Sequence, residues 1–202
     1  MKLYTSEEIR KADATYANND FDRLIGLINK AGYGLFSALP NNIENICVVS
    51  GGGNNGADGL SAALYMSVYG YSVNVYVITK NGQYNKAVEH FINELQRNNV
   101  NISFISGNEY TNSTIVQFSD VIKCADVIFD CLFGTGLCGE IHDMYKDIIN
   151  LINTHGNYII SADIASGVNG DTGEIPTIAV KADKTVSFAV YKIGNLIYPG
   201  RE

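Results

Sequence analysis

The sequence alternates short apolar runs with longer segments of helical periodicity, and this alternation limits the possible folds more than any other feature. Apolar runs rich in β-branched residues predict strands at residues 46–50, 73–79, 102–105, 127–133, 158–163 and 185–190. Helical periodicity marks residues 58–68, 85–98, 111–124 and 143–155, between most of these strands. Nearly apolar strands that alternate with helices predict an α/β fold, in which helices cover both faces of a mainly parallel sheet.

Two helices are predicted before the first strand. Thr5 and Glu8 have the spacing of a capping box, which starts a helix that runs to about Ala17. Asp20 can cap a second helix that runs through Leu39, and Pro40 closes it. The second helix contains small residues that predict close packing against a neighbouring element, namely Ala31, Gly32 and Gly34.

The length and composition of the chain predict a single folded domain over residues 1–202. The chain is 46% hydrophobic and 17% charged, which is ordinary for a globular protein, and it contains no linker or internal repeat. Its net charge of -7 and the lack of any basic run argue against a nucleic-acid partner, because phosphate neutralisation needs clustered Lys and Arg. No apolar stretch has the length of a signal peptide or a membrane span, so we expect no membrane association.

The cysteines and histidines do not form a metal-binding pattern. The cysteines contain no Cys-x-x-Cys pair, and the histidines are far apart in the sequence. We therefore expect structural thiols in a reducing cytoplasm rather than a zinc site. The residues concerned are Cys47, Cys124, Cys131, Cys138, His90, His142 and His155.

The first candidate binding loop is SGGGNNGADG, residues 50–59, between a predicted strand and a helix. Ligands of open parallel sheets bind at the carboxyl ends of the strands, and glycines let the backbone approach a phosphate there. The loop contains G-x-G-x-x-G, but no acidic residue lies between Gly59 and Val88 to hold a ribose, and no P-loop lysine follows. A tight turn that needs glycine only for its geometry is the alternative, and Asn54, Asn55 and Asp58 favour a ligand site.

Two further loops begin with an aspartate at the end of an apolar run. Asp130 starts the loop DCLFGTGLCGE, and Asp163 starts the loop DIASGVNGDTGE. In the second loop, Ser166 offers a hydroxyl group, and we interpret the segment that contains Asp171 as a plain turn. A buried carboxylate is costly unless it is paired or coordinated to a cation, although Asp130 could simply cap its own loop. If their strands are neighbours, about 5 Å apart, the two carboxylates share one cleft and need a proton or a metal to coexist. The oxygen-rich groups suit a hard cation, and the residues leave potassium, sodium and magnesium open.

Four motifs, in this order, resemble the YjeF N-terminal domain family, and the resemblance covers essentially the whole chain. They are GNNGADG (53–59), DCLFGTGL (130–137), DIASGVNGDTGE (163–174) and ADKTVSFAVYKIGNLIYPGRE (182–202). Three positions depart from the common family forms: Ala57 replaces a glycine, Ala165 a proline and Asn29 a glutamate. The last of these puts any role of that glutamate in doubt.

The resemblance implies a three-layer α/β/α Rossmann-like domain with an N-terminal helix pair and NAD(P)H-hydrate epimerase activity. Such an enzyme interconverts the R and S forms of 6-hydroxylated NADH and NADPH, with a potassium ion in the site. By motif position, the potassium ligands are Asn55, Asp130 and Ser166. The residues implied to contact the hydrated dinucleotide are Asn54, Asn55, Gly56, Ala57, Asp58, Gly134, Thr135, Gly136, Leu137, Cys138, Gly139, Glu140 and Asp163.

The hydroxyl-bearing ring carbon of the hydrate is also bonded to nitrogen, so epimerisation needs either loss of the hydroxyl as water or opening of the ring. Both routes need an acid/base group, and we assign Asp163, a carboxyl expected to lie beside Asp130. Lys192 either approaches the same cleft or lies on the surface.

Two other functions stay open at this point. One is a non-catalytic nucleotide-binding or scaffold module of the same family, against which the presence of Asn55, Asp130, Asp163 and Ser166 together argues. The other is an NAD-dependent dehydrogenase, which the missing ribose-binding acid disfavours. The resemblance further implies a homodimer, and a following ADP- or ATP-dependent dehydratase domain of ribokinase-like fold.

Overall fold

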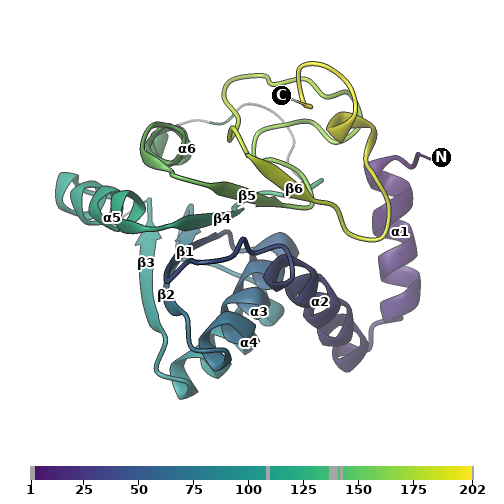
Figure 1. The fold of residues 1–202 in the computed structure, drawn as a ribbon. Coiled ribbons are helices and arrows are strands. Elements are labelled where there is room, and N and C mark those ends of the chain that lie inside the picture. Colours follow the sequence, from purple (N-terminus) through teal and green to yellow (C-terminus); the bar gives the residue numbers. More distant parts are fainter. Residues whose placement is uncertain (1–2, 108–109, 137–140, 142, 202) are drawn as a thin grey trace.

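The computed structural model describes residues 3–107, 110–136, 141 and 143–201. Within these residues the strands form one sheet in the order β3-β2-β1-β4-β5-β6, and every pairing is parallel (Figure 1). The strands are β1 (Asn45–Ser50), β2 (Ser72–Thr79), β3 (Asn101–Ser106), β4 (Val127–Cys131), β5 (Ile159–Ala162) and β6 (Lys184–Val186). This order is that of a doubly wound α/β sheet, so the predicted fold class is confirmed.

Helices cover both faces of the sheet, which gives the predicted three layers (Figure 1). Side chains of α2, α3 and α4 build the apolar cluster on one face, and side chains of α5 and α6 build the cluster on the other. The helices are α1 (Ser6–Ala17), α2 (Phe21–Phe36), α3 (Asn54–Val68), α4 (Lys86–Arg97), α5 (Asn112–Cys124) and α6 (Asp143–His155), and a short 3₁₀ helix, η1, spans Ile193–Asn195.

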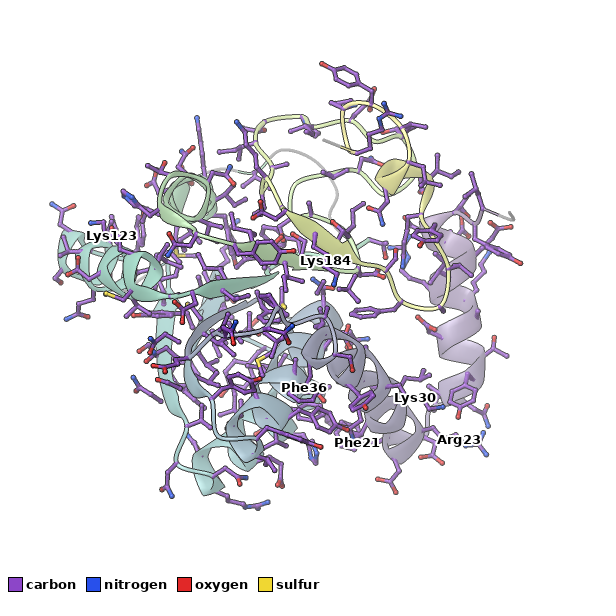
Figure 2. All side chains as sticks on the ribbon, viewed as in Figure 1. Phe21, Arg23, Lys30, Phe36, Lys123 and Lys184 are labelled. Atoms are coloured by element: carbon purple, nitrogen blue, oxygen red, sulfur yellow. The ribbon has the colours of Figure 1, made fainter. Side chains whose placement is uncertain are left out.

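The central strand β1 is buried on both faces. Ile46 and Val48 pack into the cluster under α2, α3 and α4, and Cys47 and Val49 pack into the opposite cluster. Alternate residues of a strand point to opposite sides, so a strand that must fill two cores reads as an unbroken apolar run. Figure 2 shows side chains filling both spaces between the sheet and its helices.

The N-terminal helix pair forms as predicted, with one difference in packing. Thr5 and Glu8 make a reciprocal capping box for α1, and the Asp20 side chain caps α2. A Cβ atom at Gly32 would lie 2.5 Å from the Ser61 hydroxyl oxygen of α3, so glycine is required for this helix contact. Gly34 has open space around it, so the prediction of close packing was wrong at that position.

Three predicted element boundaries differ from the structure by three or more residues. α2 ends at Phe36, before two turns that lead to Pro40, and α3 begins four residues early because Gly53 takes the extended N-cap conformation. β6 ends at Val186, because the chain turns inward there and the Phe188 amide donates to the Asp163 carboxylate, 3.1 Å away. The ammonium group of Lys184, on this edge strand (Figure 2), donates a hydrogen bond to the carbonyl oxygen of Ala38, which follows α2. This contact joins β6 to the helix pair.

Two of the cysteines, Cys47 and Cys131, are buried free thiols in β1 and β4, as predicted, and Cys124 is exposed. Cys138 and His142 lie outside the described residues. In the part of the chain that the structure describes, no group of three His, Cys, Asp or Glu side chains is arranged to hold a metal ion. Among the same residues, no helix combines the length and apolar character that crossing a bilayer requires.

Candidate functional site

A cavity of about 730 Å³ opens at the carboxyl ends of the strands, where the sheet order reverses between β1 and β4. This reversal is where doubly wound folds bind their ligands. Its walls come from α1, the β1–α3 loop, the loop after β4, the end of β5 and the segment before η1. A larger cavity of about 950 Å³ lies between α6 and the C-terminal segment, and it contains none of the predicted site residues.

The glycines of the first loop bring it against the exit of β4. A Cβ atom at Gly51 would overlap the carbonyl oxygen of Leu132, and one at Gly56 would overlap the carbonyl oxygen of Gly51. Geometry alone therefore explains these two glycines, as the turn alternative proposed. It does not explain the polar side chains of Asn54, Asn55 and Asp58, which line the cavity at the start of α3.

The amino end of α3 supplies the positive end of a helix dipole to the cavity. Gly53 caps the 15-residue helix without a side-chain hydrogen bond, and no acidic residue occupies the first turn. Exposed amides at such a helix end suit an anionic group such as a phosphate.

Asp130 lies beneath the cavity rather than in it, at 0% exposure. Its carboxylate accepts hydrogen bonds from the Ser161 hydroxyl at 2.7 Å, from the Ser166 hydroxyl at 2.5 Å and from the Ser166 amide at 2.9 Å. Burial raises the pKa of Asp130, and these hydrogen bonds oppose the shift. β4 and β5 are neighbours, which was the condition for a cleft shared by Asp130 and Asp163, and Asp130 pairs in register with Ser161. The shared cleft does not form, because Asp130 is fully buried and only Asp163 lines the cavity.

A chain of hydrogen bonds joins the residues that the resemblance implies as cation ligands. The Asn55 side-chain amide donates to the Phe133 carbonyl oxygen at 3.0 Å, and the Phe133 amide donates to the Ser166 hydroxyl at 3.0 Å. The Ser166 hydroxyl in turn contacts Asp130. A Cβ atom at Gly134 would lie 3.2 Å from Asn55, so glycine there leaves space beside the Asn55 side chain.

Asp163 opens on the cavity, and its charged partner is Lys192 rather than Asp130. The Asp163 side chain is 14% exposed, and its carboxylate forms an ion pair with the Lys192 ammonium. Lys192 is 1% exposed and also donates to the carbonyl oxygens of Phe188 and Val190, so the surface-lysine alternative was wrong. Asp163 has a left-handed φ of 68°, and its main-chain carbonyl accepts hydrogen bonds from Asn195 and Ser187.

Two more carboxylates lie on the cavity wall. Burial raises the pKa of Asp58 well above its usual value, the charges of Asp163 and Asp13 raise it further, and Lys192 opposes the shift. The pKa of Asp13 in α1 is also raised, first by desolvation and then by Asp163. Nothing in the local sequence around Asp13 or its neighbour Arg10 marks them as cavity residues, since only the docking of α1 brings them there.

Asp171 holds α1 in place, so the interpretation of its segment as a plain turn was incomplete. Its carboxylate accepts a hydrogen bond of 2.6 Å from the amide of Ser6, the first residue of α1. Tyr4 also pairs with Lys192 in an isolated parallel bridge. The N-terminal segment is thus attached to the loops that carry the site.

The structure brings most of the predicted substrate residues to one cavity. Those that line it are Asn54, Asn55, Asp58, Gly134, Thr135, Gly136 and Asp163. Gly56 and Ala57 are buried in α3 behind this wall. Leu137, Cys138, Gly139 and Glu140 lie outside the described residues. Asn29, which replaces the family glutamate, accepts a hydrogen bond from Ser61 between α2 and α3.

The doubly wound sheet and the polar cavity at its switch point place this chain among the Rossmann-like α/β domains. The chain belongs to the family described as YjeF-related protein N-terminus, whose model matches residues 25–194. A likeness to the crystal structure of yeast ynu0 shows the same fold, with a TM-score of 0.79 and 21% identity over 96% of this chain and 83% of that one.

Two relatives in sequence have names that describe an activity. The NAD(P)H-hydrate epimerase of Limosilactobacillus reuteri is 30% identical over 205 residues, which cover 100% of this chain and 91% of the relative. The bifunctional NAD(P)H-hydrate repair enzyme Nnr of Thermofilum pendens is 37% identical over 155 residues, or 77% of this chain. The matched segment spans only 29% of the length of that second relative.

Proposed function

We propose that this protein is an NAD(P)H-hydrate epimerase, an isomerase that interconverts the R and S forms of hydrated NADH and NADPH as cofactor repair. The observation that carries the proposal is the joint opening of the α3 amino end and the Asp163 carboxylate on one cavity. The helix end suits the phosphates of a dinucleotide, and the carboxylate suits proton transfer at the ring. The full-length relative named as an epimerase identifies the substrate.

Asp163 is the acid/base group that we place against the hydroxyl-bearing ring carbon. Its hydrogen bonds to Lys192 and to the Phe188 amide fix the carboxylate while it still opens on the cavity. Fixed geometry of this kind lowers the reorganisation needed when the proton moves. The left-handed backbone at Asp163, which few non-glycine residues adopt, turns the chain at the end of β5.

A potassium ion belongs to the proposal, and the residues present fit it. Asn55, Phe133, Ser166 and Asp130 offer only oxygen atoms as ligands, and the single carboxylate among them suits a monovalent hard cation better than zinc. A bound potassium ion would supply positive charge near the substrate phosphates and offset the Asp130 charge. Asn55 and Ser166 would orient the Phe133 segment around it through the hydrogen bonds already described.

The protein's setting is also part of the proposal. We place it in the reducing cytoplasm that the cysteine pattern predicts, and we take it to be a homodimer, as the family resemblance implies. The Thermofilum relative is named as bifunctional, which supports a partnership with an ADP- or ATP-dependent dehydratase domain.

The test is conversion of purified R hydrate of NADH, followed by chromatographic separation of the two epimers. The protein should bring the mixture to equilibrium much faster than the spontaneous reaction, and faster in potassium buffer than after exchange into sodium. Binding of the hydrate without faster conversion would instead identify a non-catalytic module. A blank result for hydride transfer with NAD and a panel of alcohols separates the proposal from a dehydrogenase.

A further inference from the structure

The cavity holds a second carboxyl group whose environment differs from that of Asp163. Asp58 comes from α3 and Asp163 follows β5, so two separate elements present carboxyl groups to the same space. The Asp163 carboxylate accepts from the Lys192 ammonium and from the Phe188 amide. Among the described residues, no hydrogen bond to the Asp58 carboxyl is formed, so this group is available to a ligand in the cavity.

The charges around Asp58 favour its protonated form. Asp163 at the end of β5 and Asp13 on α1 are the negative groups that interact with it, and the buried Cys131 thiol of β4 is the other titratable group within its range. Lys192 is the positive group that interacts with it, and Arg10 lies across the cavity on α1. Lys192 is already in contact with Asp163. The state of lowest free energy for the two carboxyl groups is therefore the one in which Asp58 keeps its proton.

We propose that Asp58 is a second catalytic residue, which donates the proton to the leaving hydroxyl while Asp163 takes the proton from the incoming water. This inference rests on the proposed epimerase function and assigns separate roles within it. Two carboxyl groups held in opposite protonation states are a recurrent solution for acid/base chemistry at neutral pH.

The carbon–oxygen bond breaks, and its electron pair stays with the oxygen, which takes the Asp58 proton and leaves as water. The lone pair of the ring nitrogen forms a carbon–nitrogen double bond. Water then adds to the other face of the ring, its oxygen pair forms the new carbon–oxygen bond, the double-bond pair returns to nitrogen, and the released proton goes to Asp163. The reverse epimerisation moves the same proton from Asp163 to Asp58, and proton exchange through the open cavity resets the pair.

The decisive variant is Asp58→Asn, compared with Asp120→Asn on the far helix α5, where an exposed carboxylate is changed in the same way. Asp58→Asn should lower kcat by about 100- to 10,000-fold, with KM for the R hydrate little changed, because the amide keeps the shape but has no acidic proton to transfer. It should also remove the fall of kcat/KM at high pH that loss of the Asp58 proton causes. Asp120→Asn should match the wild type in every respect.

A variant that keeps most of the wild-type kcat, or that loses activity only through KM, overturns the proposal. So does an unchanged high-pH limb. A measurement on the wild type removes any dependence on the folding of the variant. In water enriched in ¹⁸O, each epimerisation should place one solvent oxygen in the product, and conversion that retains the original oxygen overturns the proposal. A wild-type protein that fails to epimerise contradicts the proposed function itself, whereas an active wild type with an equally active Asp58→Asn contradicts only this inference.

Discussion

Asp130 and Asp163 lie near the carboxyl ends of neighbouring parallel strands and have opposite surroundings. Asp130 is inside β4, opposite Ser161, and Asp163 follows the last residue of β5. Asp130 is sealed from solvent and accepts hydrogen bonds from two serine hydroxyls, whereas Asp163 opens on the cavity and pairs with a buried lysine. The same residue type at the same edge of the sheet therefore serves as a structural anchor at one strand and as a candidate reactive group at the next. The difference comes from side chains distant in sequence.

The largest expected effect is on the reactive side of this comparison. Asp163→Asn should lower kcat by about 100- to 10,000-fold, because an amide cannot take up or release the proton at the ring carbon. Stability should fall as well, because the buried Lys192 ammonium loses its charged partner, although asparagine tolerates the left-handed backbone at this position. Epimer exchange and thermal unfolding, measured on the same preparation, check both statements. Wild-type turnover in this variant would contradict the assignment of Asp163.

The matched change at Asp130 should lower stability, and it should also weaken the potassium dependence of turnover, because Asp130 is a proposed ligand of that ion. Asp130→Asn puts an amide NH₂ against the Ser161 and Ser166 donors and leaves buried polar groups unpaired, at a cost of about 1–3 kcal/mol of unfolding free energy. For a domain of this size, each 1 kcal/mol lowers Tm by about 2–4 °C. Urea unfolding measures the loss. An unchanged midpoint would show that the buried network contributes nothing to the fold.

Lys192 tests whether the ion pair makes Asp163 different from Asp130. Lys192→Met keeps the buried volume and removes the charged donor, and kcat should fall by about 10- to 100-fold, the equivalent of one hydrogen bond to a charged group. KM should move less, because the change acts through the position of Asp163. The high-pH limb of kcat/KM should also move to higher pH, because Lys192 opposes the raised pKa of Asp58, whereas a loss of stability alone would leave the profile unchanged. Lys192→Arg serves as the charge-conserving control.

The smallest effect is expected at Ser161, which contacts Asp130 but not the cavity. Ser161→Ala removes one of the hydroxyl donors to the carboxylate and should cost about 1 kcal/mol, while the Ser166 bonds remain. The kcat of the folded protein should equal that of the wild type. If the activation free energy rises by more than the unfolding free energy falls, Asp130 and Asp163 are energetically coupled. The two aspartates then do not have the separate roles described above.

Local sequence patterns were sufficient for the fold and for the outline of the site. The unbroken apolar runs at β1 and β4 predicted a sheet buried on both faces, and the Thr5–Glu8 capping box predicted the start of α1. The polar loops after β1, β4 and β5 predicted where a ligand would bind, because parallel strands end at one edge of the sheet. Element ends were less predictable: β6 is short because its continuation bonds to Asp163 instead of to the sheet.

The sequence by itself determined that two carboxylates would stand at the ends of apolar strands, because apolar runs and the polar loops that follow them are local features of the chain. The structure decided that these two strands are neighbours. Only the tertiary structure decided which of the carboxylates would be sealed and which would face a ligand. That outcome depends on Ser161, Ser166 and Lys192, which reach their partners across 29 to 36 positions of sequence, and on α1, which brings Asp13 beside Asp58. Burial and pairing of a charge are properties of its surroundings in space, and a residue's neighbours in sequence do not specify them.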